Sequence, residues 1–270
     1  MNQYFNEVCI HKKIMKNTCK ALHVTTGKSQ ISLPLPGEEP PLITYHPAFN
    51  IDFCERLLGR KNGKVPRSTR IRLDTMQKSL APQIHPRVSF KVHEISEIKQ
   101  DDVTLGHHAT FHSRKMARSL KGANRAVVFV ATVGRKIEIT INHLMQKGEL
   151  ANACVADALG SCAVEHLAEQ FQNQIACEFL NEEQEVGLRF SPGYCDWPVT
   201  EQEILFSLVD NETAGVKLGK TCLMNPRKSI SAVFGIYDHA ETPVKHSKNP
   251  CLRCAKKDCI ARRTAVQEGN

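Results

Sequence analysis

The chain has 270 residues, of which 41% are hydrophobic and 24% charged, and its formal net charge is +8. This composition is typical of a soluble globular protein, and the length favours one domain with appendages. No apolar run reaches the roughly 18 residues that a membrane span needs, and the lysine-bearing start of the chain has no continuous apolar stretch. We therefore expect neither a membrane span nor a secretory signal, and a cytoplasmic protein.

The positive charge is concentrated in three stretches, residues 12–28, 60–72 and 245–263. Aromatic residues make up only 6% of the chain, and none is interleaved with these basic stretches to form a stacking platform for bases. Nucleic acid is therefore the less favoured partner, whereas an acidic protein or an anionic cofactor stays open.

The first part of the chain predicts an extension followed by two helices. Residues 1–44 lack sustained periodicity and are rich in proline, which predicts a flexible N-terminal extension. Asn50 is suited to cap a first helix that Gly59 ends. A second helix is predicted from Ser68 to Ala81, with its apolar residues on one face.

Two half-buried strands are predicted next, because apolar and polar residues alternate over Val88–Val92 and over Val103–Phe111. Gly106, His107 and His108 fall within the second of these segments. Adjacent residues on a strand point to opposite faces, so we do not expect the two histidines to share a metal ion.

The middle of the chain predicts the core. The β-branched run Arg125–Val133 predicts a strand buried on both faces, and a helix follows near residues 135–146. Apolar residues then recur at four-residue steps between residues 150 and 180, which predicts a long amphipathic helix. They are Val155, Leu159, Ala163, Leu167, Phe171 and Ile175.

A helix over residues 199–210 and strands over 220–224 and 230–237 complete the predicted elements. The loop at 225–229 is polar and is expected to be exposed. Together these elements predict an α+β fold, with a twisted, mostly antiparallel sheet and flanking helices.

The segment from Arg189 to Pro198 combines a cation, a Pro-Gly turn, two aromatic residues and a thiol in ten positions. Pro192 fixes its φ for a turn, Gly193 accepts a positive φ, and Pro198 opens the next helix. Arg189 then stands beside a tight loop, where a guanidinium suits a ligand carboxylate or phosphate. An ordinary connection with a surface arginine is the alternative.

Three motifs occur in order here: R-x-x-P-G-Y from Arg189, the Trp197-Pro198 helix opening, and M-x-P-x-x-S-x-S from Met224. In this order they resemble the activation (S-adenosylmethionine-binding) domain of cobalamin-dependent methionine synthase. The resemblance extends from about Phe49 to Asp238. It does not include the barrels or the corrinoid-binding domain of the full-length enzyme, which implies a free-standing relative of one module.

The resemblance implies that the protein binds S-adenosylmethionine and serves the reductive methylation of cobalamin. The cobalamin would be carried in trans by a corrinoid-binding protein or methyltransferase, with an electron donor protein supplying the reduction. Arg189 would pair with the methionine carboxylate, while Pro192, Gly193 and Tyr194 would shape the pocket. The enzyme class implied is a methionine synthase-related methyltransferase or reactivation component.

Ser229 and Ser231 would lie near the pocket or the corrin edge, or else satisfy backbone groups at a strand end. The chain has no G-x-S-x-G or H-E-x-x-H motif, and its G-x-x-x-G-K-T segment is one residue short of a P-loop. Nucleotide hydrolysis is therefore not expected. This fits a protein whose cofactors supply the bond chemistry.

Cys251, Cys254 and Cys259 place three thiols within nine residues. Eleven cysteines in a cytosolic chain favour thiols or metal ligands over disulfides. The spacing supplies three of the four ligands of an iron-sulfur cluster or a zinc ion, with Cys195 as the preferred fourth ligand and Cys222 the second candidate. The alternatives are a cluster that delivers an electron to cobalt, a structural zinc, or no metal.

The sequence thus predicts an extension over residues 1–44, an activation-like domain over 45–240 and a basic, cysteine-rich tail over 241–270. The alternative function, from another class, is a non-catalytic, metal-stabilised binding module for nucleic acid or an acidic protein.

Overall fold

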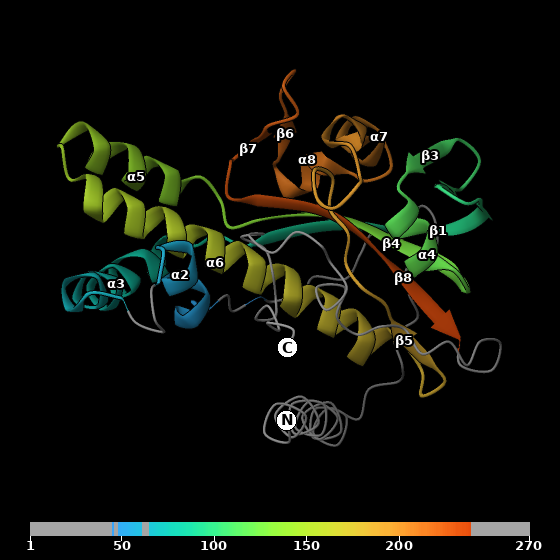
Figure 1. The fold of residues 1–270 in the computed structure, drawn as a ribbon, viewed down its shortest axis with the longest axis horizontal. Helices are drawn as coiled ribbons and strands as arrows, with labels where there is room; N and C mark the ends of the chain where they lie inside the picture. Colours follow the sequence, from blue (N-terminus) through green and yellow to red (C-terminus); the bar gives the residue numbers. More distant parts are fainter. Residues whose placement is uncertain (1–44, 46–47, 61–64, 239–270) are drawn as a thin grey trace, which may run out of the picture.

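The computed structural model describes residues 45, 48–60 and 65–238, and Figure 1 shows their arrangement. The predicted N-terminal extension and cysteine-rich tail lie outside these residues. In the described ranges, no helix combines the length and apolarity that crossing a bilayer requires.

A six-stranded sheet with the order β3-β2-β1-β4-β8-β5 forms the middle layer, and each pairing within it is antiparallel. A separate two-stranded ladder joins β6 to β7. The predicted α+β class with an antiparallel sheet is thereby confirmed. The strands are β1 (Arg87–Ile98), β2 (Asp102–Leu105), β3 (Ala109–His112), β4 (Ala123–Thr132), β5 (Gln184–Val186), β6 (Lys217–Leu218), β7 (Met224–Asn225) and β8 (Ser229–Asp238).

Helices cover both faces of this sheet (Figure 1). One face packs against α2 (Ile51–Leu57), α3 (Arg67–Leu80), α5 (Lys136–Gln146) and α6 (Leu150–Gln174), with a π-helical turn η2 (Ile175–Phe179) after α6. The other face packs against α4 (Arg114–Leu120), α7 (Gln202–Ser207) and α8 (Asn211–Ala214). Two 3₁₀ turns, η1 (Ala81–Gln83) and η3 (Val199–Glu201), precede β1 and α7.

The central strand β4 is buried on both faces, as its β-branched run predicted. Val127 and Phe129 lie in the core on the α6 side, whereas Val128 and Val130 lie in the core on the α7 side. Because side chains alternate along a strand, one strand serves both cores.

The predicted four-residue periodicity is confirmed, since the five marked apolar positions on α6 and the sixth, Ile175 at the start of η2, are all buried. The ring of Phe171 lies 4.8 Å from that of Phe129, 5.1 Å from that of Phe90 and 6.1 Å from that of Phe234, measured between centroids. These aromatic contacts fix α6 across β1, β4 and β8.

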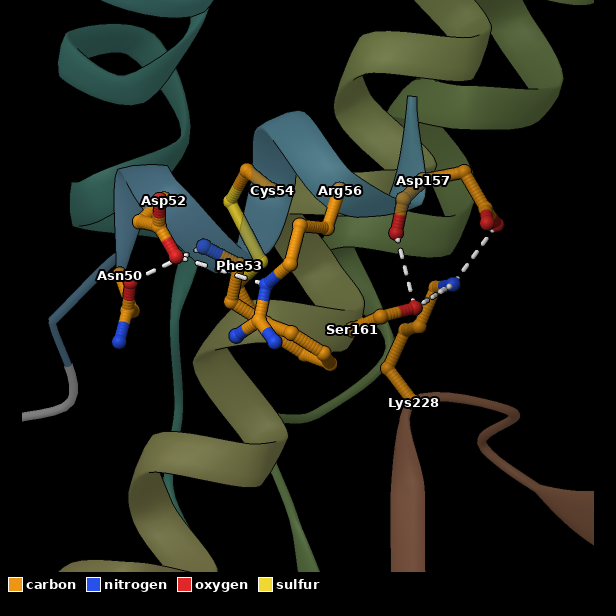
Figure 2. The surroundings of a disulfide bond; sticks show 9 residues. Asn50, Asp52, Phe53, Cys54, Arg56, Asp157, Ser161 and Lys228 are labelled. Atoms are coloured by element: carbon orange, nitrogen blue, oxygen red, sulfur yellow. Dashed lines mark hydrogen bonds and ion pairs between the residues drawn. A yellow bond between two sulfur atoms is a disulfide. The ribbon is translucent and has the colours of Figure 1, made fainter. Parts of the chain in front are cut away.

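The helix α2 is fixed at its start and in its middle. Its predicted cap is confirmed, because the Asn50 side chain accepts a hydrogen bond from the backbone N–H of Phe53 at 3.0 Å. Cys54 and Cys162, both buried, form a disulfide that ties α2 to α6 (Figure 2). The expectation of thiols is therefore wrong for this pair. The two helices bring their Cα atoms to 6.1 Å, a separation that a disulfide spans.

Two predicted strands are wrong in detail. The segment 103–111 is a hairpin of β2 and β3, and Gly106 has a φ of +57° in the turn that also contains the two histidines. The predicted strand 220–224 is instead mostly the turn between β6 and β7. In addition, the helix predicted over 199–210 is η3 and α7, which ends at Ser207.

Replacing Phe171 by alanine should lower the free energy of unfolding by about 3–5 kcal/mol, because the cavity would open among three aromatic neighbours. Urea unfolding followed by circular dichroism measures the change. Leu150→Ala is the matched control on the same helix, since Leu150 is 61% exposed; its change should stay within about 0.5 kcal/mol. Equal losses in the two variants would contradict this account of the core.

Candidate functional site

The Pro-Gly turn forms as predicted. The N–H of Tyr194 donates to the carbonyl of Ser191 at 3.2 Å, and the N–H of Gly193 donates to the carbonyl of Trp197 at 2.9 Å. Gly193 has a φ of +85°, and Cys195 has a φ of +59°. The left-handed region costs a residue with a Cβ about 1–2 kcal/mol, so surrounding contacts must hold this segment in place.

Those contacts come from η3, β3 and the start of α4. The indole N–H of Trp197 donates to Glu201 at 2.8 Å, and the backbone N–H of His112 donates to the same carboxylate at 2.9 Å. The hydroxyl of Ser113 donates to Asp196 at 2.5 Å. Sequence reasoning missed this role of Glu201, because His112 is 89 residues away and only the fold brings the two together.

A cleft of about 220 Å³ opens beside the turn, between α2, α6 and the loop before β8. Tyr194, which is 50% exposed, and Ser229 both line it, so two predicted site residues from distant motifs meet there. The lining consists of Phe53, Leu57, Ser161, Val164, Glu165, Tyr194, Arg227, Lys228, Ser229 and Ile230.

Arg189 stands behind one wall of this cleft. Its side chain is 7% exposed, and its Nη2 lies 2.5 Å from Oε2 of Glu165 on α6. Glu165 is 40% exposed and lines the cleft, whereas Arg189 is not among the lining residues. A buried guanidinium therefore orients a carboxylate that the cleft exposes. Sequence reasoning named the arginine but missed its carboxylate.

Lys228 forms part of another wall. Its ammonium lies 2.7 Å from Oδ1 of Asp157 and donates to the hydroxyl of Ser161 at 3.0 Å, as Figure 2 shows. Lys228 and Ser229 are each 8% exposed, so the expectation of an exposed loop at 225–229 is wrong for them. The ion pair and the hydrogen bond to α6 explain why the loop folds inward.

Both predicted serines lie on β8, but only Ser229 lines the cleft. The hydroxyl of Ser229 donates to the carbonyl of Pro226 at 2.7 Å, which is the strand-end role that the sequence left open, and the residue also lines the cleft. Ser231 is 3% exposed and lies outside the cleft lining.

The predicted metal ligands are only partly described. Cys251, Cys254 and Cys259 lie outside the described residues. Cys195 is exposed beside Tyr194, and Cys222 lies half-buried between β6 and β7. Within the described ranges, no three or more His, Cys, Asp or Glu side chains come close enough to hold a metal ion. Metal binding by the tail therefore stays a prediction.

A wider surface depression of about 550 Å³ lies where β4 leads into α5. It is lined by His85, Pro86, Arg87, Gly134, Arg135 and Lys136. It contains no carboxylate and none of the predicted site residues. The smaller cleft is therefore the candidate site, since it combines a carboxylate, an ammonium, an aromatic ring and apolar side chains.

Comparison with known proteins agrees with the sequence motifs. Residues 116–242 match the family described as the activation domain of vitamin B12 dependent methionine synthase. The fold is similar to a crystal structure of the MetH reactivation domain bound to AdoHcy, with a TM-score of 0.50, 16% identity and 71% of each chain covered. No curated protein matches the chain. The resemblance to the activation domain is thereby confirmed; at this identity, the structural likeness itself shows the fold alone.

Glu201→Ala should destabilise the protein by about 3 kcal/mol, because it leaves the N–H groups of Trp197 and His112 without their buried acceptor. Thermal and urea unfolding measure the loss. Glu203→Ala, an exposed neighbour on α7, serves as the control and should change stability little. Indistinguishable unfolding curves for the two variants would show that Glu201 does not hold the turn.

Proposed function

We propose that the cleft binds S-adenosylmethionine and that the protein serves the reductive methylation of a corrinoid cofactor carried by another protein. The observation that carries this proposal is that a partly exposed carboxylate, Glu165, and an exposed aromatic ring, Tyr194, line the same cleft beside the R-x-x-P-G-Y turn. The family match supports it. So does the similar structure, which holds AdoHcy, the demethylated form of S-adenosylmethionine.

The chemistry of the cleft suits this ligand. S-adenosylmethionine carries a sulfonium cation and, on its amino-acid end, an ammonium and a carboxylate. Carboxylates and aromatic faces both attract cations, and the apolar side chains of Phe53 and Leu57 offer a dry surface beside them. A volume of about 220 Å³ is less than a ligand of this size fills. The cleft would therefore take the amino-acid and sulfonium end.

The positive charge of Arg189 contributes to the proposed ligand binding in one of two ways. The resemblance implies that it pairs with the ligand carboxylate, for which it would have to leave Glu165; alternatively, it stays on Glu165 and orients that carboxylate. In both cases its loss leaves a charged group at the site without its partner, which weakens ligand binding.

A corrinoid on the partner protein would accept the methyl group and supply the reactive metal centre. The role of this chain would be alignment, because displacement at carbon needs an in-line approach. Tyr194 is half exposed at the cleft, which leaves room for a large cofactor to approach from outside. The net charge of +8 would favour an acidic corrinoid protein or electron donor as the partner in trans.

Titration calorimetry with S-adenosylmethionine tests the proposal. The unchanged protein should bind, and Arg189→Ala should weaken binding by at least about tenfold, as expected when a charged group at the site loses its cationic partner. Arg67→Ala, an exposed arginine on α3, should bind like the unchanged protein. If the unchanged protein does not bind the ligand, the non-catalytic binding module becomes the better account.

The cysteine tail has its own test, since its metal is proposed on spacing alone. Anaerobically purified protein should contain bound iron with visible charge-transfer absorbance, or else zinc without it. Cys254→Ser should lose that metal, whereas Cys154→Ser, an exposed cysteine on α6, should retain it. Protein that is free of both metals would remove the tail site from the proposal.

A further inference from the structure

The disulfide between Cys54 and Cys162 joins two walls of the cleft. Cys54 directly follows Phe53 on α2, and Cys162 directly follows Ser161 on α6. Phe53 and Ser161 both line the cleft. Figure 2 shows the disulfide near Ser161, whose hydroxyl accepts a hydrogen bond from the ammonium of Lys228. A movement of α2 relative to α6 would therefore change the shape of the cleft.

Apart from the disulfide, α2 is attached to the rest of the fold by partial contacts. Among its seven residues, only Cys54 and Glu55 are buried. Glu55 forms an ion pair with Arg70 on α3, whose side chain is 51% exposed, and such exposure limits what the pair contributes. The remaining apolar side chains of α2 pack against the core but are only partly buried; they are Ile51, Phe53 and Leu57. A helix this short is unstable in water without tertiary contacts, so the covalent bond is the strongest of its attachments.

The helix α2 also lies outside the segment that matches the family. The match covers residues 116–242, which contain Cys162 but not Cys54. The disulfide therefore attaches a wall from outside the matched segment to a helix inside it. The sequence predicts a cytoplasmic protein, and a disulfide in that compartment is usually transient and redox-sensing.

Reduction of this disulfide by a dithiol is a balanced two-electron reaction. A thiolate of the dithiol attacks one sulfur, which breaks the bond between Cys54 and Cys162 and forms a mixed disulfide. The second thiol of the reductant then displaces the protein sulfur. The protein gains two electrons and two protons as a pair of thiols, and the reductant becomes a disulfide. Because both cysteines are buried, a reductant reaches the sulfurs only when α2 moves away from α6.

We propose that the disulfide between Cys54 and Cys162 is a redox switch that regulates the cleft. While the bond is intact, α2 is held on α6, and its Phe53 and Leu57 complete the apolar wall. Reduction by a dithiol releases α2, so the cleft loses that wall and binds its ligand more weakly. The inference rests on the proposed function, because it takes S-adenosylmethionine as the ligand. Reductive methylation acts on a cofactor that has been oxidised, and the same oxidising conditions would form the bond.

Titration calorimetry compares S-adenosylmethionine binding by the oxidised protein and by protein reduced with dithiothreitol. Reduction should weaken binding by at least about threefold, as expected when α2 lies in place for only about a third of the time. Cys54→Ala, which cannot form the bond, should bind like the reduced protein under both conditions. Cys154→Ser removes an exposed cysteine of α6 and should keep the full redox response.

Hydrogen exchange measures the release of α2 without any ligand. The amides of α2 should exchange at least about tenfold faster after reduction, because the bond no longer opposes local opening. The amides of α3 serve as the internal reference and should not change. Mass spectrometry after alkylation of the denatured chain detects the bond itself: Cys54 and Cys162 should be protected before reduction and alkylated after it.

Four outcomes would overturn the switch while S-adenosylmethionine binding stands. Alkylation of both cysteines without a reductant would mean that the bond does not form. Equal affinity in the two redox states would mean that the bond does not regulate the cleft, and a change in affinity without faster exchange would mean that α2 is not the part that moves. A redox response that persists in Cys54→Ala would assign it to other cysteines. Protein that binds the ligand in neither state would overturn the proposed function and its regulation together.

Discussion

The packing of α6 across the sheet is the interaction on which the rest of the structure depends. Phe171 and the remaining buried apolar residues of this helix pack in the core. Asp157, Ser161 and Glu165 follow one another at four-residue steps on the same helix and hold Lys228 and Arg189. Because the core fixes α6, it also fixes the spacing of the charges along the cleft.

Periodic segments and turn chemistry were predictable from the sequence, because their signals are local. The long apolar repeat predicted α6, and the β-branched run predicted β4. In the turn that follows Pro192, Gly193 has the expected positive φ. The hairpin at Gly106 was missed, because alternation continues on both sides of a short turn and reads as one strand. The edge strand β5 has three residues, which is too few for a periodic signal.

The sequence predicted only those residues of the site that belong to a recognisable motif. The sequence named Tyr194, Ser229 and Arg189, and the fold brings the first two into one cleft. Glu165 and Lys228 carry no local signal, since an acid on a helix and a lysine in a basic loop read as solvated residues. Their roles arise from contacts across 24 residues in the first case and 67 in the second. Only tertiary packing creates such pairs.

The walls of the cleft come from segments far apart in the chain, from Phe53 on α2 to Ile230 on β8. An unfolded chain therefore has no such cleft, and a small molecule that occupies it binds the native state alone. By mass action, occupancy and folding become linked: each tenfold rise in ligand above its dissociation constant adds about 1.4 kcal/mol to the free energy of unfolding. If the ligand is the proposed methyl donor, its concentration would raise the stability of the native state together with the occupancy of the cleft.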